Sequence, residues 1–248
     1  AVALNADECQ IYTDVDGIFT TDPRVCSKAR LLKEVSFEEM LELSSSGAKV
    51  LQLRSVEYAS KFNLPIRVLS SFNEGNGTLV QEEKNIMERP IVSGISSIDT
   101  EAKLTIRGVP DVPGIAAKIL SPISEAGIEV DVIVQNISAD NCTDFTFTVD
   151  KGDAENAKEI LQKTSVSLGG GLVEVDHDIA KISVVGRGMR AHAGVASKMF
   201  QALAKDEINI SMITTSEIKI SVVIKESEMK KAVTALHNAF DLDKELDS

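Results

Sequence analysis

Apolar and polar positions along the chain follow two periods, one near two residues and one near 3.6. In the amino-terminal part, apolar runs at 11–15 (IYTDV) and 66–71 (IRVLSS) predict strands. The apolar spacing at 37–46 and 56–62 predicts helices, and the opening AVALNADE has the composition of a helix. Strands alternating with helices indicate an α/β unit.

A second pattern follows residues 73–90, whose glycines, asparagines and charges predict a linker. Beyond it the same order of strands and helices occurs twice. The first copy is predicted as strand 103–109, helix 113–126, strand 129–138, strand 143–149, helix 153–164 and strand 171–178. The second is predicted as strand 181–187, helix 194–206, strand 209–216, strand 219–224 and helix 226–239.

The two copies also match residue by residue. Gly108 and Gly186 are 78 positions apart, and a constant offset of 80 then relates further pairs. These pairs are Gly114 with Gly194, Lys118 with Lys198, Ile128 with Ile208 and Ile133 with Ile213. A two-residue loop insertion explains the change of offset, so the pattern indicates a duplicated fold unit. The unit resembles the ACT domain, a ferredoxin-like βαββαβ module that binds small amino acids.

The second copy ends without its last strand, whereas the strand pattern at 91–99 (IVSGISSID) has no partner of its own. An unpaired sheet edge invites association. We therefore predict that residues 91–99 pair into the sheet of the second copy and not of the first.

Composition narrows the functional classes. The 248 residues are 43% hydrophobic and 26% charged, with a net charge of −12 and a pI near 4.8. This acidic balance argues against a nucleic-acid partner, which would need clustered Lys and Arg. The scattered cysteines Cys9, Cys26 and Cys142 argue against a disulfide framework and for a reducing, cytoplasmic setting. No membrane span or signal peptide is expected, and the start at Ala1 suggests a piece of a longer polypeptide.

The segment 11–24 (IYTDVDGIFTTDPR) concentrates chemistry at a predicted strand end. It holds three acidic residues, three threonines and Arg24. Ligands of α/β folds bind outside the carboxyl ends of strands, where carboxylates can hold Mg²⁺ or hydroxyls and Arg can hold phosphate. The alternative is a solvated turn, because Asp-Gly and Asp-Pro form turns.

This segment, with FEEMLEL, GAKVLQLRS and PIRVLSSF behind it and the paired ACT-like copies, resembles the aspartate kinase family over nearly the whole chain. The resemblance implies an amino acid kinase fold and transfer of a phosphoryl group from MgATP to the side-chain carboxylate of L-aspartate. Mg²⁺ would arrive with ATP, and no metal ligands are assigned to the chain. The implied ATP contacts are Thr13, Asp14, Phe19, Asp22, Arg24, Lys49 and Val50. Family members often have Tyr at the position of Phe19, and a phenyl ring still packs on adenine.

The resemblance also implies a division of the chain. Residues 1–72 would be the C-terminal part of the kinase domain, 73–90 a linker and 91–99 the strand that completes the second ACT domain. The first ACT domain would span 100–179 and the second 180–242. The family's Lys-Phe-Gly-Gly loop and its Gly-Ser-Asp segment are not present in this sequence. We therefore expect half of an active site and no activity from this chain alone.

Lys49, in the sequence SGAK, has two interpretations. A Lys at a helix end is favoured by the helix dipole and is usually solvated. The resemblance instead assigns its ammonium a catalytic role on the ATP phosphates, where a cation would stabilise the transferring group.

The strand-to-helix turn of each copy is the candidate effector site. In the first copy Asp111 can balance an ammonium, Pro113 has a φ suited to a first helical turn, and Gly114 leaves open the N–H groups that favour a carboxylate. The alternative is a simple N-cap by Asp111. The resemblance implies lysine, threonine or both as effectors. The implied contacts are Asp111, Gly114, Glu129, Asp131, Gln135, Val195, Ala196, Asn209, Ile210, Thr215, Ser216 and Glu217. The resemblance further implies homo-oligomers through the ACT domains or α/β hetero-oligomers.

The histidines carry little signal. His177 and His237 are expected on the surface, and His192, in the second turn, is the one closest to a candidate site. A rival interpretation is a non-catalytic regulatory subunit made by internal initiation near Met87, for which residues 9–72 would be unnecessary. A weaker one is a free-standing amino-acid-binding protein.

Overall fold

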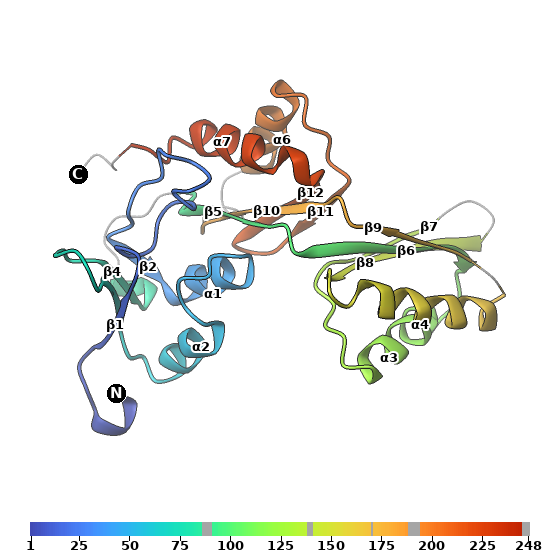
Figure 1. Cartoon of the computed structure of the whole chain (residues 1–248), viewed down its shortest axis with the longest axis horizontal. Coiled ribbons are helices and arrows are strands. Elements are labelled where there is room, and N and C mark those ends of the chain that lie inside the picture. The colour runs from blue at the N-terminus through green and yellow to red at the C-terminus, as the bar shows by residue number, and fades with distance from the viewer. Residues whose placement is uncertain (86–90, 138–140, 170, 188–193, 245–248) are drawn as a thin grey trace. The chain divides into compact units, whose positions relative to one another are not determined.

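The computed structural model describes residues 1–85, 91–137, 141–169, 171–187 and 194–244 (Figure 1). Met87 and His192 lie outside the described residues. The described residues divide into two compact units, residues 1–98 with 181–248 and residues 99–180. No helix in the described part of the chain is both long and apolar enough to span a bilayer.

The amino-terminal segment that resembles the kinase family, residues 9–81 and here called the kinase-like segment, forms a four-stranded sheet with strand order β1-β3-β4-β2. β1 is parallel to β3, β2 is parallel to β4, and β3 is antiparallel to β4. Helices α1 and α2 pack on this sheet, and the shared core includes Phe37 and Met40 of α1, Val56 of α2 and Val68 of β3. The elements are β1 (Cys9–Thr13), β2 (Glu34–Ser36), α1 (Phe37–Ser45), α2 (Leu53–Lys61), β3 (Ile66–Ser70) and β4 (Thr78–Gln81).

Two predictions in this part were wrong. The amino-terminal helix is only the short 3₁₀ turn η1 (Val2–Leu4), after which Asn5 is left-handed with φ 49°. The linker prediction missed β4, which pairs with both β3 and β2, and the 3₁₀ turn η2 (Glu83–Asn85). β4 is a short TLVQ run whose Thr78 and Val80 are fully buried, and the glycines and asparagines before it hid that pattern.

Helix α1 shows how the local sequence fixes an element. Ser36 is its N-cap and forms a capping box with Glu39, each side chain bonding the other's main-chain N–H. Glu38 and Glu39 in the first turn also favour the positive end of the helix dipole. The helix begins where this chemistry places it and presents Met40 and Leu43 to the core.

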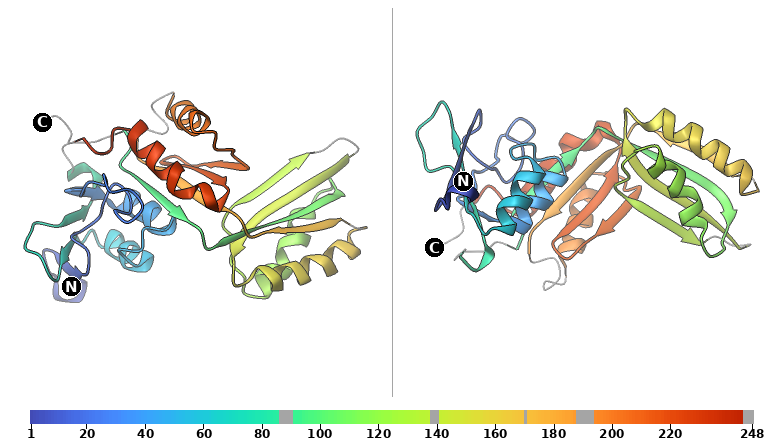
Figure 2. Two further views of the ribbon diagram at one scale, coloured as in Figure 1. Left: turned by 45° about the horizontal axis from the view of Figure 1, so that its top comes forward. Right: turned by 90° about the horizontal axis from the view of Figure 1, so that it is seen from below.

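The first repeat is the second unit and forms a complete βαββαβ sheet with strand order β7-β8-β6-β9 (Figure 2). Its core is built from alternate residues of the strands, such as Leu104, Ile106, Phe145 and Phe147, packed on Ile119 of the helix layer. The elements are β6 (Glu101–Pro110), α3 (Ile115–Glu125), β7 (Ile133–Ile137), β8 (Cys142–Asp150), α4 (Ala154–Ser167) and β9 (Leu172–Asp176).

The second repeat forms the matching sheet, with order β11-β12-β10-β5. β5 (Gly94–Ile98) is antiparallel to β10, with Lys181 opposite Ile98, so it occupies the place that β9 has in the first repeat. This is the pairing expected for the unclaimed strand. The other elements are β10 (Ala180–Val185), α6 (Val195–Lys205), β11 (Met212–Thr215), β12 (Lys219–Ile224), the 3₁₀ turn η4 (Glu226–Glu228) and α7 (Met229–Ala239).

His237 is buried, contrary to the surface position predicted for it. It lies on the core-facing side of α7 with Val233 and Leu236, and its Nε2 lies 2.9 Å from Oγ1 of Thr20 in the kinase-like segment. His177 has a half-exposed side chain, as predicted.

Candidate functional site

The first candidate site lies at the carboxyl end of β1. Thr13 is the last residue of this strand, and its carbonyl accepts the N–H of Ser71 at 2.7 Å. Its hydroxyl donates to Asp14 Oδ1 at 3.0 Å. Because β1 and β3 are parallel, both strands end at this edge, where α/β folds place their ligands.

Arg24 in the loop beyond β1 is oriented by Asp22. Its Nη2 lies 2.8 Å from Asp22 Oδ2 and its Nε 3.1 Å from Oδ1, while Oδ1 also accepts the Arg24 N–H at 2.8 Å. The hydrogen bonds from the Arg24 side chain lower the pKa of Asp22. The guanidinium is nevertheless 89% exposed, so it is held in direction and remains open to an anion.

The base of this loop is fastened to the sheet by Thr78 of β4, a residue of the predicted linker. The Thr78 hydroxyl accepts the Ile18 N–H at 2.9 Å and donates to the Leu32 carbonyl at 2.6 Å. Phe19, between these anchors, bridges to Leu31 and is half-buried. The loop therefore has an ordered inner side and an exposed outer side that carries Arg24.

Lys49 and Val50 lie in the connection between α1 and α2. The helix ends at Ser45, so Lys49 stands beyond it and the helix-dipole interpretation loses force. Lys49 is exposed and Val50 half-buried. Among the described residues no hydrogen bond or ion pair joins Lys49 to the loop after β1, so their convergence on one nucleotide stays a prediction. Nor does any group of three or more His, Cys, Asp and Glu in the described ranges have the arrangement of a metal site.

The second candidate site is the turn between β6 and α3. The helix begins at Ile115 behind Gly114, and no side chain caps it. The N-cap alternative for Asp111 is thus excluded, and Pro113 precedes the first helical turn instead of lying in it. The turn 111–114 is exposed, and the Asp111 N–H donates to the Asn141 carbonyl at 2.9 Å. The turn thus carries an exposed acidic side chain, and the helix that follows it begins without a side-chain cap.

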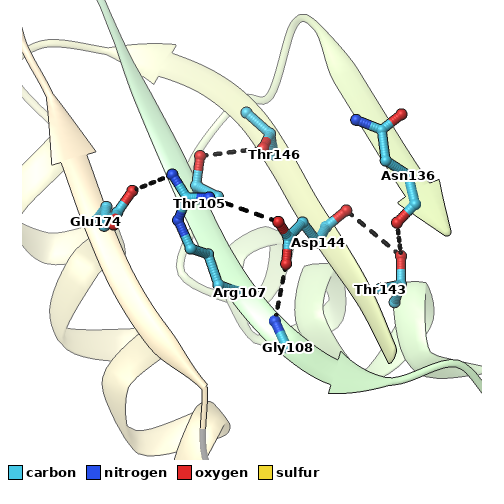
Figure 3. A network of polar contacts seen from close by, with 8 residues as sticks. All are labelled: Thr105, Arg107, Gly108, Asn136, Thr143, Asp144, Thr146 and Glu174. Carbon is cyan, nitrogen blue, oxygen red and sulfur yellow. Dashed lines mark hydrogen bonds and ion pairs between the residues drawn. The ribbon is translucent and has the colours of Figure 1, made fainter. Parts of the chain in front are cut away.

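A polar network fixes the strand just before this turn (Figure 3). Gly108 has φ 65° in a bulge of β6, and its N–H donates to Asp144 Oδ1 at 2.9 Å. Arg107 contacts Asp144 at 3.6 Å and Glu174 at 2.8 Å. Asp144 thus holds the bulge from the neighbouring strand, and the bulge sets where the turn emerges.

The structure separates the remaining candidates of the first repeat. Thr143 of β8 pairs with both Val109 and Ile137, so the carboxyl end of β7 lies at the same end of the sheet as the turn. Gln135 is two residues from that end. Glu129 and Asp131 precede β7 at the opposite end, and all three are exposed. Of these three, Gln135 is therefore the one toward the end of the sheet that carries the turn.

The second repeat shows the same division. The Gly186 N–H, just beyond β10, donates to the Ile218 carbonyl at 2.9 Å, which places the β11–β12 turn at the end where α6 begins. The candidates at this end are Val195, which is buried, Ala196, which is half-buried, and Thr215, Ser216 and Glu217, which are exposed. Asn209 and Ile210 precede β11 at the other end, roughly 17 Å from Thr215 at strand spacing.

Three contacts of the candidate sites were not predicted. Thr78 anchors the first loop, Asp144 anchors the bulge, and Lys219 contacts Glu42 of α1. Asp144 left a local signal, an acidic residue within an apolar strand, but Lys219 and Glu42 are too far apart in sequence to form a pattern.

Comparison with known proteins accounts for each part of the chain. Residues 1–70 match the amino acid kinase family, and residues 104–165 and 182–240 each match the ACT domain. The exact domain boundaries given in the sequence analysis stay a prediction.

The order of these parts is that of aspartate kinases. The aspartokinase of Pseudomonas aeruginosa is 62% identical over 98% of this chain, which spans 60% of that relative's length. Escherichia coli aspartokinase III, solved with aspartate and ADP, is 27% identical with a TM-score of 0.80, covering 96% of this chain and 53% of its own. It was also solved with lysine and aspartate, with a TM-score of 0.76.

The ACT region has its own match. The regulatory subunit of aspartate kinase from Thermus thermophilus is 40% identical with a TM-score of 0.58, and the match covers 99% of that subunit and 60% of this chain. A kinase-type sheet, two successive ACT sheets and these identities lead to one conclusion: the chain belongs to the aspartate kinase family.

Proposed function

We propose that this chain is part of an enzyme that transfers the γ-phosphoryl group of MgATP to the side-chain carboxylate of L-aspartate, forming an acyl phosphate. The observation that carries the proposal is the pair of exposed cations, Arg24 and Lys49, borne by connections of a kinase-type sheet. The Escherichia coli relative solved with aspartate and ADP supports the same chemistry.

The donor set fits a nucleotide. Arg24 and Lys49 supply positive charge for phosphates, and Asp22 keeps Arg24 in one direction. The half-buried Phe19 and Val50 offer apolar surface to a base, while Thr13 and Asp14 at the end of β1 offer hydrogen bonds. Phosphoryl transfer depends mainly on positioning and charge neutralisation, and ATP supplies the group that is transferred. Lys49 would stabilise the charge that develops on that group.

We further propose that the ACT sheets bind lysine, threonine or both and inhibit the kinase. An α-amino acid needs an acceptor for its ammonium and donors for its carboxylate. Asp111 and the uncapped start of α3 offer these, and α6 begins without a side-chain cap as well. The relative solved with lysine supports this assignment. The effector would bind between ACT sheets of two chains, in homo-oligomers or α/β hetero-oligomers in the cytoplasm.

A second candidate is a non-catalytic regulatory subunit. It is favoured by the match to the Thermus thermophilus regulatory subunit over nearly all of that subunit. The folded segment 9–70, with the proposed nucleotide contacts, speaks for the kinase instead.

The deciding experiment joins this chain to the amino-terminal part of the Pseudomonas aeruginosa aspartokinase and measures aspartate-dependent ATP turnover. We expect activity from the fusion and none from the 248-residue chain alone. Lys49→Ala should lower turnover roughly tenfold or more, the scale for losing an electrostatic donor. Lys61→Ala, at the exposed end of α2, is the matched control. An inactive fusion that still binds lysine or threonine would favour the regulatory subunit.

A further inference from the structure

Helix α1 is held against the second repeat within the first unit (Figure 1). Lys219, the first residue of β12, has its Nζ 2.7 Å from Glu42 Oε2 and 3.5 Å from Ser46 Oγ. The two charged side chains are only 21% and 25% exposed. Because the pair is partly buried, salt screens it less than it screens an exposed pair, and separating it would leave each charge less well compensated.

The exit of α1 has a second contact with the same sheet. Gly47 has φ +108°, and a Cβ at this position would lie 2.4 Å from the carbonyl oxygen of Ser97 in β5. Glu39, earlier on the helix, bonds Ser93 just before β5. The main chain that leads from α1 to Lys49 and Val50 therefore rests on two strands of the second repeat.

Lys219 is also part of the β11–β12 turn. Its carbonyl accepts the Ser216 N–H at 2.8 Å, and Ser216 Oγ accepts the Ile218 N–H at 3.4 Å. This turn carries Thr215, Ser216 and Glu217, the exposed candidate effector contacts. One residue thus has its main chain in the candidate effector turn and its side chain on the helix that precedes Lys49.

We propose that Lys219 is a positioning residue that couples the turn 215–217 to the segment 46–50. The inference rests on the proposed function, because it needs an amino acid at the turn and a nucleotide contact at Lys49. An effector that shifts the turn moves the Lys219 ammonium, and Glu42 with the end of α1 follows it. The coupling operates only as far as the effector binds the two positions of the turn with different affinity.

Hydrogen exchange of the full 248-residue chain reads this coupling without any assay of turnover. The Ser46 N–H donates to the Glu42 main-chain carbonyl at 3.1 Å, and the Ala48 N–H donates to the Leu43 carbonyl at 2.9 Å. Exchange of these two amides therefore reports on the end of α1. Without ligand, Lys219→Met should raise exchange at 46–48 several-fold. Lys219→Arg should leave it near the wild-type value, and so should Lys225→Met, a control just beyond the same strand.

With saturating lysine or threonine, exchange at 46–48 should change in the wild-type chain. Lys219→Met should still bind the amino acid by calorimetry, yet show no change at these amides. Binding without a response in the wild type, or with an unchanged response in Lys219→Met, overturns the coupling and leaves the effector site standing. If neither amino acid binds, the effector assignment itself is wrong and the coupling falls with it.

Discussion

Thr20 and His237, 217 positions apart, form a buried hydrogen bond of 2.9 Å between Oγ1 and Nε2. Thr20 Oγ1 also accepts the Arg30 N–H at 3.0 Å, so this hydroxyl joins α7 to the loop after β1. The hydroxyl can donate to Nε2 or accept from it, and Nδ1 of the ring is buried without a hydrogen-bond partner among the described residues. The charged groups around the ring are Asp243, Lys28 and Arg30, and burial dominates them in lowering the pKa of His237.

This contact predicts a pH-dependent stability. The unfolded histidine, with a pKa near 6.5, binds a proton that the folded ring resists. The stabilisation is therefore complete above about pH 6.5 and is lost as pH falls through the lower pKa of the folded state. Between pH 8 and 5, calorimetry should show a larger fall in Tm for the wild type than for His237→Gln. His177→Gln, at a half-exposed position, is the control, and parallel curves for His237→Gln and wild type would contradict the prediction.

Asp111→Ala should weaken binding of lysine or threonine by about 1–3 kcal/mol, because it removes one partner of a charge-assisted hydrogen bond. Isothermal titration would show this as roughly a 5- to 150-fold higher Kd. Asp178→Ala, exposed in the same unit, should bind as the wild type does. An unchanged affinity in Asp111→Ala would remove the turn 111–114 from the effector site.

Asp144→Ala should also weaken effector binding, although Asp144 is not itself an assigned contact. The substitution removes the acceptor of the Gly108 N–H, so the bulge that leads to the turn is no longer held in place. The loss of this hydrogen bond should lower the free energy of unfolding by about 0.5–1.5 kcal/mol. Glu174→Ala removes the other carboxylate from Arg107 and leaves the bulge fastened. The bulge is unimportant for the site if titration shows equal affinities for the two variants.

Gly47→Ala should destabilise the first unit by about 1–3 kcal/mol, because alanine is strained at φ +108° and its Cβ would meet the Ser97 carbonyl. Gly75→Ala is the matched control, since a Cβ there has nothing within 4 Å. Urea unfolding followed by circular dichroism measures the stability of both variants. Equal unfolding midpoints would contradict the prediction, because they would show that α1 can move away from β5 without loss of stability.

The two repeats could be predicted from the sequence, because each strand and helix has a strong period and the glycines recur in register. The spacing of apolar residues on α7 also bears on His237. On α7 the buried residues Ala232, Val233 and Leu236 define an apolar face, and His237 lies four positions after Val233. A helical period thus predicts that this histidine is buried. No local pattern predicts that its partner is Thr20, 217 positions away.

Other elements and contacts could not be predicted from the sequence, for a different reason. β2 and β4 are strands of three and four residues, too short to show a period. They are fixed by pairing, β2 with β4 and β4 with β3. The pair formed by Lys219 and Glu42 depends on two surfaces meeting, which the spacing of neither residue records. The candidate nucleotide and effector residues rest on family motifs and not on periodicity.

The pairing of β5 with β10 makes the first repeat an insertion within the second. The chain lays down β5, then builds residues 99–180, and returns with Lys181 opposite Ile98. During synthesis the inserted repeat has all of its strands before its host has more than one, so it can fold first. Its ends leave and enter at adjacent residues of an antiparallel pair, a gap that a tight hairpin turn can close. Evolution could therefore exchange or delete the whole first repeat without breaking the sheet of the second repeat, which contacts α1.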